Sequence, residues 1–408
     1  MSSVNQSAPG LSAPVKESTS VPTKNTAFVL HGIDDVRYEE RPVPTEVGPN
    51  DAIVAPKAVS ICGSDVHYLK HGRIGDFVVN NPMILGHETA GIVVKVGSNV
   101  KDLKPGDRVA LEPGESCRVC PDCKGGHYER CPDMIFAATP PYDGTLAGFY
   151  TLPADLCYKL PDNMTLEEGA LLEPMSVGVH AVSKVAEMKP ASNVVIFGAG
   201  PVGLLTAAAA KGLGAARVIA IDIQEPRLQF AKEAGLVHDY CLPPKPKDGE
   251  SREDYPIRSA AEIRERFGFT ERGPKGVDLV IDCSGAEVCI QTACHLLKHG
   301  GTLVQVGMGK PDVTLPLHTI LSHELSVKGS FRYGPGVYNL SLDLVARGAV
   351  NLKSLISHRY TFAEAYQGFV DNHRGKANDG KPVIKCLIAG PEDGVQVPLG
   401  ENLVQASA

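Results

Sequence analysis

The sequence has no long hydrophobic run, no block of basic residues and no N-terminal targeting signal of the usual kinds. No stretch approaches the roughly 18 consecutive apolar residues of a membrane-spanning helix. Basic residues number 40 and acidic residues 47, a net charge of -7, which argues against nucleic acid as the main partner. Only two lysines and no arginine precede Val36, few for a transit peptide, and no charged-then-apolar signal peptide is present. We therefore expect a cytoplasmic protein that binds neither membrane nor nucleic acid.

The chain contains enough apolar residues to form large cores. It also contains an unusual group of cysteines. Its 408 residues are 43% hydrophobic, which suits a globular protein with two domains. The 11 cysteines are an odd number, and four of them fall within the 15 residues from Cys117 to Cys131. In a reducing compartment such clustering favours metal binding over disulfides.

The stretch from Ser60 to Gly91 carries the first candidate metal site. Cys62, His87 and Glu88 offer a thiolate, an imidazole and a carboxylate, which are suitable ligands for a zinc ion that keeps a fourth position open. An open position suits a catalytic zinc. A lone buried cysteine and a satisfied core histidine are the alternative that spacing alone leaves open.

The four clustered cysteines form the second candidate metal site. The spacing is Cys117-x2-Cys120-x2-Cys123-x7-Cys131, and four thiolates can enclose one tetrahedral zinc with no open position. This arrangement predicts a structural zinc that stabilises a loop. Free or disulfide-bonded cysteines are the alternative.

A glycine motif occurs in the second half of the chain, directly after a continuous apolar run. The apolar run from Val194 to Phe197 is typical of a strand buried on both faces. Gly198, Gly200 and Gly203 follow in a G-x-G-x-x-G pattern, and a second strand ends at Asp222, 19 residues after Gly203. In this strand–glycine–helix–strand–acid context the motif predicts dinucleotide binding, with Asp222 accepting from a ribose 2′-hydroxyl.

The order of strands and helices predicts an α/β fold with two domains. Short strands separated by glycine and proline indicate a barrel-like β domain over residues 25–174. Alternating strands and helices over 175–329 indicate a doubly wound parallel Rossmann sheet. Residues 330–390 are expected to return to the first domain. Residues 1–24 are expected to form a disordered tail and 391–408 a loose one.

Three further residues suggest chemistry near the first candidate site. Glu173 lies among apolar residues, where a carboxylate is costly unless it is paired or bound to metal. A charge at a helix N-terminus beside Pro174 is its alternative role. Ser64 and His67 suit a hydroxyl-to-imidazole proton relay. A helix N-cap and a surface histidine are the corresponding alternatives.

The motif Gly86-His87-Glu88-x-x-Gly91-x5-Gly97-x-x-Val100 resembles the signature of the zinc-containing medium-chain alcohol dehydrogenases. The resemblance covers roughly residues 27–390 and is strongest to the polyol dehydrogenases of that family. It is carried by four segments: 62–68 (CGSDVHY), 140–146 (PPYDGTL), 172–174 (LEP) and 329–334 (GSFRYG). The resemblance implies a GroES-like catalytic domain joined to a Rossmann domain, two zinc ions per chain, NAD as cofactor, and a homodimer or homotetramer.

The resemblance also implies roles for individual residues. Cys62, His87 and Glu88 match the ligands of the catalytic zinc, with Glu173 beside it, so the third ligand stays open between the two glutamates. Substrate contact is implied at Tyr68, Glu173, Arg332 and Tyr333. Cofactor contact is implied at Val202, Asp222, Arg227, Val306, Gly307, Met308, Ser330, Phe331 and Arg332.

The activity that follows is the oxidation of a polyol to a ketose by hydride transfer to NAD. Xylitol is the first expected substrate, with sorbitol (or L-iditol) and L-arabinitol as alternatives. Outside the enzyme class, a non-enzymatic dinucleotide-binding protein of the same fold is the competing hypothesis, because fold alone does not determine function. The intact Cys62, His87 and Glu88 set argues against it.

Overall fold

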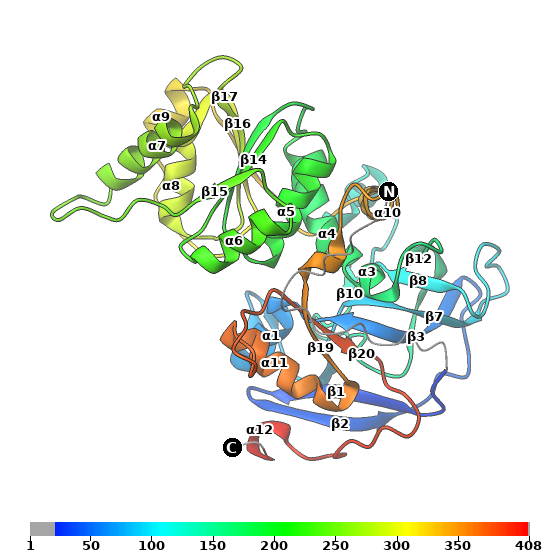
Figure 1. Cartoon of the computed structure of the whole chain (residues 1–408). Helices are drawn as coiled ribbons and strands as arrows, with labels where there is room; N and C mark the ends of the chain where they lie inside the picture. Colours follow the sequence, from blue (N-terminus) through cyan, green and yellow to red (C-terminus); the bar gives the residue numbers. More distant parts are fainter. Residues whose placement is uncertain (1–20, 407–408) are drawn as a thin grey trace, which may run out of the picture. The chain divides into compact units, whose positions relative to one another are not determined.

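The computed structural model describes residues 21–406, which form two compact units (Figure 1). One unit contains the described residues up to Glu173 together with those from Val345 onward, and the other contains Pro174–Leu344. Most of the tail expected at residues 1–24 lies outside the described residues. No helix among the described residues is long and apolar enough to cross a membrane.

The first unit is built on β-sheets whose strands pair antiparallel, except that β19 and β20 pair in parallel. Its main sheet has seven strands in the order β12-β8-β7-β3-β20-β19, with β11 pairing to β3, and a second sheet has the order β2-β1-β6. The pairs β4–β5 and β9–β10 form two small sheets of their own. The strands are β1 Asn25–Gly32, β2 Asp35–Arg41, β3 Asp51–Ser60, β4 Arg73–Ile74, β5 Phe77–Val78, β6 Met83–Ile84, β7 Glu88–Val96, β8 Arg108–Leu111, β9 Gly114–Glu115, β10 Ile135–Phe136, β11 Tyr150–Pro153, β12 Cys157–Lys159, β19 Ile356–Tyr360 and β20 Lys385–Ala389.

Short helices fill the connections of this unit. They are α1 Gly63–His71, α2 Pro121–Lys124, α3 Leu166–Ala170, α11 Ala365–Arg374 and α12 Leu403–Ala406, with 3-10 turns at Tyr128–Arg130, Ala154–Leu156, Leu352–Leu355 and Phe362–Glu364.

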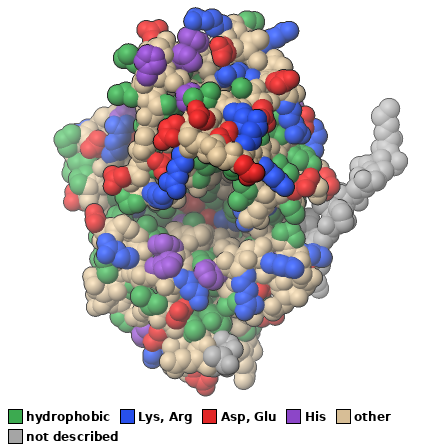
Figure 2. All heavy atoms as spheres, turned by 90° about the vertical axis from the view of Figure 1, so that its left-hand side faces the viewer, with side chains coloured by type: hydrophobic (Ala, Val, Ile, Leu, Met, Phe, Trp, Pro, Cys, Tyr) green, Lys and Arg blue, Asp and Glu red, His purple; other side chains and the backbone are tan. Residues whose placement is uncertain are grey.

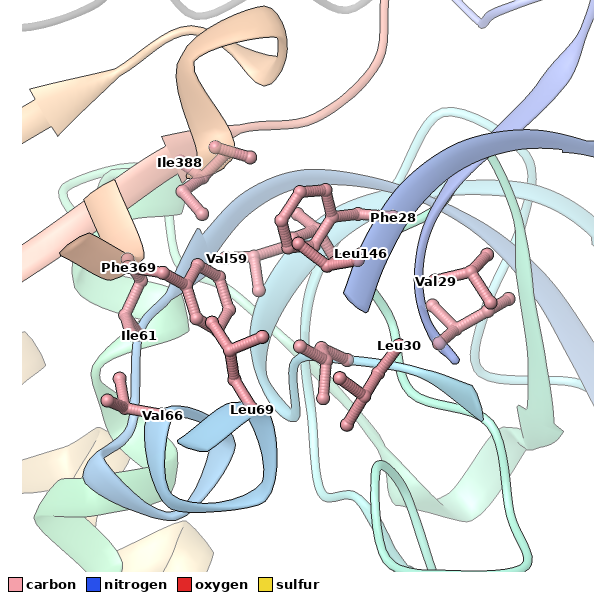
Figure 3. Packing of buried hydrophobic residues seen from close by; sticks show 14 of the residues in the cluster. Phe28, Val29, Leu30, Val59, Ile61, Val66, Leu69, Leu146, Phe369 and Ile388 are labelled. Carbon is pink, nitrogen blue, oxygen red and sulfur yellow. The ribbon is translucent and has the colours of Figure 1, made fainter. Parts of the chain in front are cut away.

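The largest core of the first unit joins segments that are far apart in the sequence. Figure 3 shows Phe28, Val59, Leu69, Phe369 and Ile388 gathered in one cluster, and each is at most 1% exposed. They come from β1, β3, α1, α11 and β20. Burial of these side chains therefore holds the C-terminal segment against the N-terminal strands.

The sequence predicted a loose tail over residues 391–408, and the described part of it contacts this unit at a few positions near its end. The Gly400 N–H donates to the Tyr38 carbonyl at 2.8 Å, and Asn402 Nδ2 donates to the Asp34 carbonyl at 3.4 Å. Leu403 is 8% exposed and belongs to the main core cluster. The polar composition concealed this packing, because one buried leucine and a few backbone hydrogen bonds are enough to dock the segment.

The second unit is an all-parallel sheet with the strand order β15-β14-β13-β16-β17-β18. Helices α5 and α6 lie on one side of the sheet, and α7, α8 and α9 on the other (Figure 1). The strands are β13 Asn193–Phe197, β14 Arg217–Ile221, β15 Asp239–Cys241, β16 Val277–Asp282, β17 Leu297–Gln305 and β18 Ser326–Gly329. The helices are α5 Pro201–Gly212, α6 Glu225–Glu233, α7 Asp254–Phe267, α8 Glu287–Leu296 and α9 Leu317–Ser322. Strand order runs outward from β13 in both directions, which makes the carboxyl end of β13 the topological switch point.

The boundary between the units falls at residues 344 and 345, whereas the sequence predicted it at 329 and 330. Helix α4 (Leu172–Val179) and helix α10 (Val337–Ala346) cross the two unit boundaries, and a π-helical segment, His180–Val185, follows α4. Ser176 Oγ donates to Ser341 Oγ at 3.0 Å, and the Gly334 N–H donates to His180 Nδ1 at 3.3 Å. These contacts hold residues 330–344 in the second unit.

Helix α7 begins at Asp254 and ends at Phe267. Ser251 Oγ accepts from the Asp254 N–H at 3.0 Å, and Pro256 lies in the first turn, where its missing N–H costs no helical hydrogen bond.

Candidate functional site

The first candidate metal site is assembled by the pairing of β3 with β7. Cys62 follows β3 and lies at the N-terminus of α1, while His87 precedes β7 and Glu88 begins it. Ser60 pairs with Glu88 across the two strands. One ligand atom from each of Cys62, His87 and Glu88 lies within 4.8 Å of the other two. The register of one strand pair thus brings together residues that are 25 positions apart.

Asp65 lies beside the imidazole of this cluster. Its Oδ1 lies 3.4 Å from His87 Nδ1 and accepts from the Gly86 N–H at 3.1 Å. Burial by itself lowers the pKa of His87, but the charges of Asp65 and Cys62 outweigh it and raise that pKa well above 6.5. A buried imidazole whose pKa is raised in this way lies in a negatively charged environment. A carboxylate behind a metal-binding histidine is also the usual outer-shell arrangement, so the residues fit a zinc ion.

Lys385, which the sequence analysis missed, is the buried cation of this cluster. Its side chain is 3% exposed, and its Nζ contacts Glu88 Oε2 and donates to the Ile61 carbonyl at 3.2 Å. Burial opposes its charge, yet Glu88, Cys62 and Glu173 together raise its pKa above 10.5. The available signal was a single lysine inside the apolar run from Val383 to Ile388.

The structure groups Glu88, and not Glu173, with Cys62 and His87. Glu173 lies in α4, is 5% exposed and acts on Lys385 through its charge. Both glutamates are therefore part of one buried electrostatic environment, in which Glu88 is the one close enough to Cys62 and His87 to share a metal ion with them.

We expect Lys385→Met to lower the free energy of unfolding by roughly 3–5 kcal/mol in the metal-free protein, because Glu88 would stay buried without its partner. The loss should be smaller in the zinc-loaded protein, since a cation in the cluster would neutralise Glu88 in place of the ammonium group. Urea unfolding with zinc and with a chelator measures both values.

Lys57→Met is the matched control for that substitution. Lys57 lies on β3 in the same unit, and its buried Nζ has no hydrogen-bond partner among the described residues. Its removal should be neutral or stabilising. An equal loss of stability for Lys385→Met with and without zinc would contradict the placement of Glu88 as a metal ligand.

The four clustered cysteines also come together. One Sγ from each of Cys117, Cys120, Cys123 and Cys131 lies within 4.8 Å of the others, and none of the chain's 11 cysteines forms a disulfide. Backbone N–H groups of Val119 and Cys120 lower the pKa of Cys117 to about 7. A closed set of four sulfur ligands fits a structural zinc.

A buried carboxylate ties the cysteine loop to the sheet. Tyr128 in the loop and Tyr158 on β12 both donate their hydroxyls to Glu112, at 2.5 and 2.6 Å. Glu112 is 1% exposed and follows β8. The loop is thus anchored at a second point besides its cysteines.

The glycine motif lies at the switch point of the second unit. A Cβ atom at Gly203 would lie 1.8 Å from the Gly198 carbonyl oxygen, and Gly198 has a φ of +92°. Only glycine fits these two positions, because the helix start packs directly on the loop. The backbone N–H groups at the start of α5 therefore stay open to a phosphate group.

Asp222 is held in place beside this loop. One carboxylate oxygen accepts from the Ala199 N–H at 2.6 Å and the other from the Gln224 N–H at 2.8 Å. The next residue, Ile223, is 79% exposed and lines a cavity of about 1160 Å³ within the second unit. The segment 242–255 and the loop 284–288 form other walls of that cavity. The arrangement fits the adenosine half of a dinucleotide.

The remaining predicted cofactor residues lie at the carboxyl ends of β17 and β18. Val306, Gly307 and Met308 follow β17, and Met308 is 78% exposed. The Ser330 hydroxyl is buried and has no hydrogen-bond partner among the described residues. An orphaned buried hydroxyl fits a site that a ligand completes.

The predicted substrate residues are distributed over both units. Tyr68 on α1 is 3% exposed and belongs to the main core cluster of the first unit. In the second unit Arg332 has a left-handed φ of +52°, and its guanidinium carbon lies 4.8 Å from the Phe331 ring centroid. Tyr333 is 3% exposed and packs edge-on against Tyr338. Substrate contact stays a prediction for all of them.

Ser64 and His67 are placed one turn apart on α1. Ser64 is half-buried and His67 exposed, and no hydrogen bond between them occurs in the described part of the chain. Burial and the neighbouring His71 lower the pKa of His67.

Acidic and basic side chains are interspersed on the face that Figure 2 shows.

Comparisons with known proteins agree with both halves of the fold. Residues 48–162 match the alcohol dehydrogenase GroES-like domain, and residues 201–347 match the zinc-binding dehydrogenase domain. "Probable D-xylulose reductase A" of Aspergillus clavatus is 50% identical over 92% of this chain and 99% of its own length. "D-xylulose reductase A" of Aspergillus niger is 49% identical over 90% of this chain and 97% of its own length.

Solved structures show the same architecture. An Escherichia coli oxidoreductase/dehydrogenase of unknown specificity aligns with a TM-score of 0.78 and 31% identity, covering 91% of this chain and 100% of its own. Escherichia coli L-idonate 5-dehydrogenase aligns with a TM-score of 0.76 and 26% identity, covering 90% and 98%. The fold and the two metal-ligand clusters define a zinc-binding dehydrogenase. The chain belongs to the medium-chain family of these enzymes.

Proposed function

We propose that this protein is a zinc- and NAD-dependent polyol dehydrogenase that oxidises xylitol to D-xylulose. The observation that carries the proposal is the buried Cys62, His87 and Glu88 cluster, in a chain that is 50% identical to a D-xylulose reductase over almost its whole length. Sorbitol (or L-iditol) and L-arabinitol are the alternative substrates. Initial rates with NAD across a panel of polyols and simple alcohols test the proposal directly.

Two zinc ions per chain are proposed, one for each cluster. The zinc at Cys62, His87 and Glu88 would supply Lewis acidity that lowers the pKa of a bound hydroxyl. Asp65 places a negative charge 3.4 Å from His87 Nδ1, while Lys385 neutralises one oxygen of Glu88. These groups keep the ligand atoms in place before the reaction begins.

We propose that the substrate proton leaves through Ser64 and His67. The lowered pKa of His67 keeps its imidazole neutral at pH 7, so that it can accept a proton. Its exposure allows it to pass that proton to water. The substrate carbon then transfers hydride to the nicotinamide.

Asp222 should make the enzyme prefer NAD to NADP by about 100-fold or more in kcat/KM. The 2′-phosphate of NADP would lie beside the fixed carboxylate, and two unit charges 4 Å apart repel by about 4 kcal/mol at an effective dielectric constant of 20. Ile223 offers no compensating cation, and Arg227 lies five positions further on. Steady-state rates with both cofactors measure the preference.

Asp222→Asn provides the matched variant, since it keeps the size of the side chain and removes its charge. The preference for NAD should shrink in that variant. Equal catalytic efficiency of the wild-type enzyme with NAD and NADP would refute the assignment.

We further propose a cytoplasmic homodimer or homotetramer. Leu317 and Leu321 on α9 and Val327 on the edge strand β18 are 72%, 75% and 42% exposed, an apolar surface that suits self-association. Analytical ultracentrifugation determines the oligomeric state.

A further inference from the structure

A buried carboxylate at the carboxyl end of β16 is held entirely by hydrogen bonds. Asp282 is fully buried, and no ion pair involves it in the part of the chain that the structure describes. One oxygen accepts from the Ser284 hydroxyl at 2.6 Å. The other accepts from the Gly285 N–H at 2.8 Å and from Gln305 Nε2 at 2.7 Å. A buried charge without a cation depends on such donors.

Gln305 lies directly opposite Asp282 on the neighbouring strand β17. Its Nε2 donates both to Asp282 and to the Gly307 carbonyl, at 2.7 and 2.8 Å. Two acceptors at the nitrogen determine the orientation of the amide. Its Oε1 is then left buried without a hydrogen-bond partner among the described residues. An unsatisfied buried acceptor costs about 1–3 kcal/mol, which an apolar side chain of similar size would avoid.

The residues after β16 and after β17 are packed backbone against backbone. A Cβ atom at Gly307 would lie 2.4 Å from the Gly285 nitrogen, and one at Gly309 would lie 1.8 Å from the Gly285 oxygen. The Val306 and Gly307 N–H groups both donate to the Asp282 carbonyl at 2.9 Å. The loops 283–286 and 306–309 therefore form one closely packed assembly. The hydrogen bond between Gln305 and Asp282 links the two strand ends from which these loops start.

This assembly lies on the opposite side of β13 from Asp222, because the sheet order places β14 on one side of β13 and β16 and β17 on the other. An extended dinucleotide that crosses the switch point with its adenosine ribose at Asp222 would bring its nicotinamide half to the ends of β16 and β17. We infer that Asp282 and Gln305 are positioning residues for the nicotinamide half of the cofactor. They act by setting the place of Val306, Gly307 and Met308. The inference rests on the proposed NAD-dependent function.

The test compares two ligands that differ only in the nicotinamide. Gln305→Met keeps the length of the side chain and removes both donated hydrogen bonds. We expect it to weaken NAD binding and to lower kcat by as much as about 100-fold, because a displacement of about 1 Å near the reacting atoms can cost that much. Binding of ADP-ribose, which lacks the nicotinamide, should weaken much less, because the loop 284–286 lines the adenosine cavity whereas Val306, Gly307 and Met308 are proposed to contact the nicotinamide half. Isothermal titration calorimetry on the full chain measures both affinities.

Gln367→Met is the matched control. Gln367 Nε2 donates to the buried carboxylate of Asp371 at 2.8 Å, so the same chemical change is made in the first unit. It should change stability without changing the ratio of the NAD and ADP-ribose affinities. If Gln305→Met does not fold, Gln305→Glu takes its place, because a second carboxylate beside Asp282 should displace the same loop.

The possible outcomes separate the inference from the proposed function. A wild-type protein that binds neither NAD nor ADP-ribose would refute the function itself. A wild-type protein that binds both, with a Gln305 variant that weakens both equally or neither, would overturn only the positioning role of Asp282 and Gln305.

Discussion

Xylitol is expected to exceed ethanol in kcat/KM by as much as about 10⁴- to 10⁵-fold. A site that hydrogen-bonds several substrate hydroxyls discriminates to this extent, because its buried polar groups are left unpaired by an alcohol that lacks those hydroxyls. The proposed substrate residues Tyr68 and Glu173 are 3% and 5% exposed, so water reaches them poorly. Initial rates with NAD for xylitol, sorbitol, L-arabinitol and ethanol give the comparison.

Arg332→Leu tests the same site from the side of the protein. It should reduce polyol efficiency far more than it reduces NAD binding, since the guanidinium group is proposed to donate to substrate hydroxyls. Arg332→Lys is the matched control, because leucine and lysine tolerate the φ of +52° at this position about equally poorly. If ethanol or a long-chain alcohol reacts faster than xylitol, the polyol assignment is wrong and the enzyme is a general alcohol dehydrogenase.

Features encoded over short stretches of sequence could be predicted well. The apolar run Val194–Phe197 lies within β13, and the strand that precedes Asp222 is β14. The spacing of four cysteines within 15 residues leaves few arrangements other than a single cluster. The Cys62, His87 and Glu88 trio was also found, because the motif around His87 is specific to the family.

Contacts between distant residues could not be predicted in this way. Lys385 reaches Glu88 across 297 positions, and no local periodicity reports such a partner. The same holds for the docking of residues 399–403 beside β2 and for the inclusion of residues 330–344 in the second unit. The burial of Asp282 by donors from two loops is a further example. Each of these depends on which strands become neighbours, and pairing of that kind is decided by the whole fold.

The electrostatic part of the site illustrates why this limit matters for function. The sequence identified the anionic groups Cys62, Glu88 and Glu173 but not the cation among them. Asp65 is a further buried carboxylate of this region, and the raised pKa of His87 favours its cationic form. Without Lys385 the negative groups would exceed this one positive group, and such an arrangement is stable only with compensating charge. Lys385 supplies part of that charge, and a metal cation bound in place of the His87 proton would supply the rest.

Cys62→Ser is expected to reduce turnover by about 10³-fold or more while dinucleotide binding is retained. Loss of an outer-shell partner of a metal ligand already costs about 10- to 100-fold, and Cys62 is placed in the ligand trio itself. The glycine motif and Asp222 lie in the second unit and do not depend on Cys62. Zinc content should fall from two ions per chain to one, as measured by atomic absorption, and NADH fluorescence should still report binding.

Two further cysteine variants make this experiment decisive. Cys157→Ser alters a thiol whose pKa burial raises to about 12, and which lies outside both clusters, so turnover should be kept. Cys120→Ser removes a ligand from the other cluster, so this variant should also lose one zinc. It should lower the thermal stability of the protein, while the enzyme that stays folded should keep its substrate preference largely unchanged. The two sites are then distinguished by what the loss of one zinc changes: turnover at Cys62 and stability at Cys120. Full turnover of Cys62→Ser would exclude this cluster as the catalytic site.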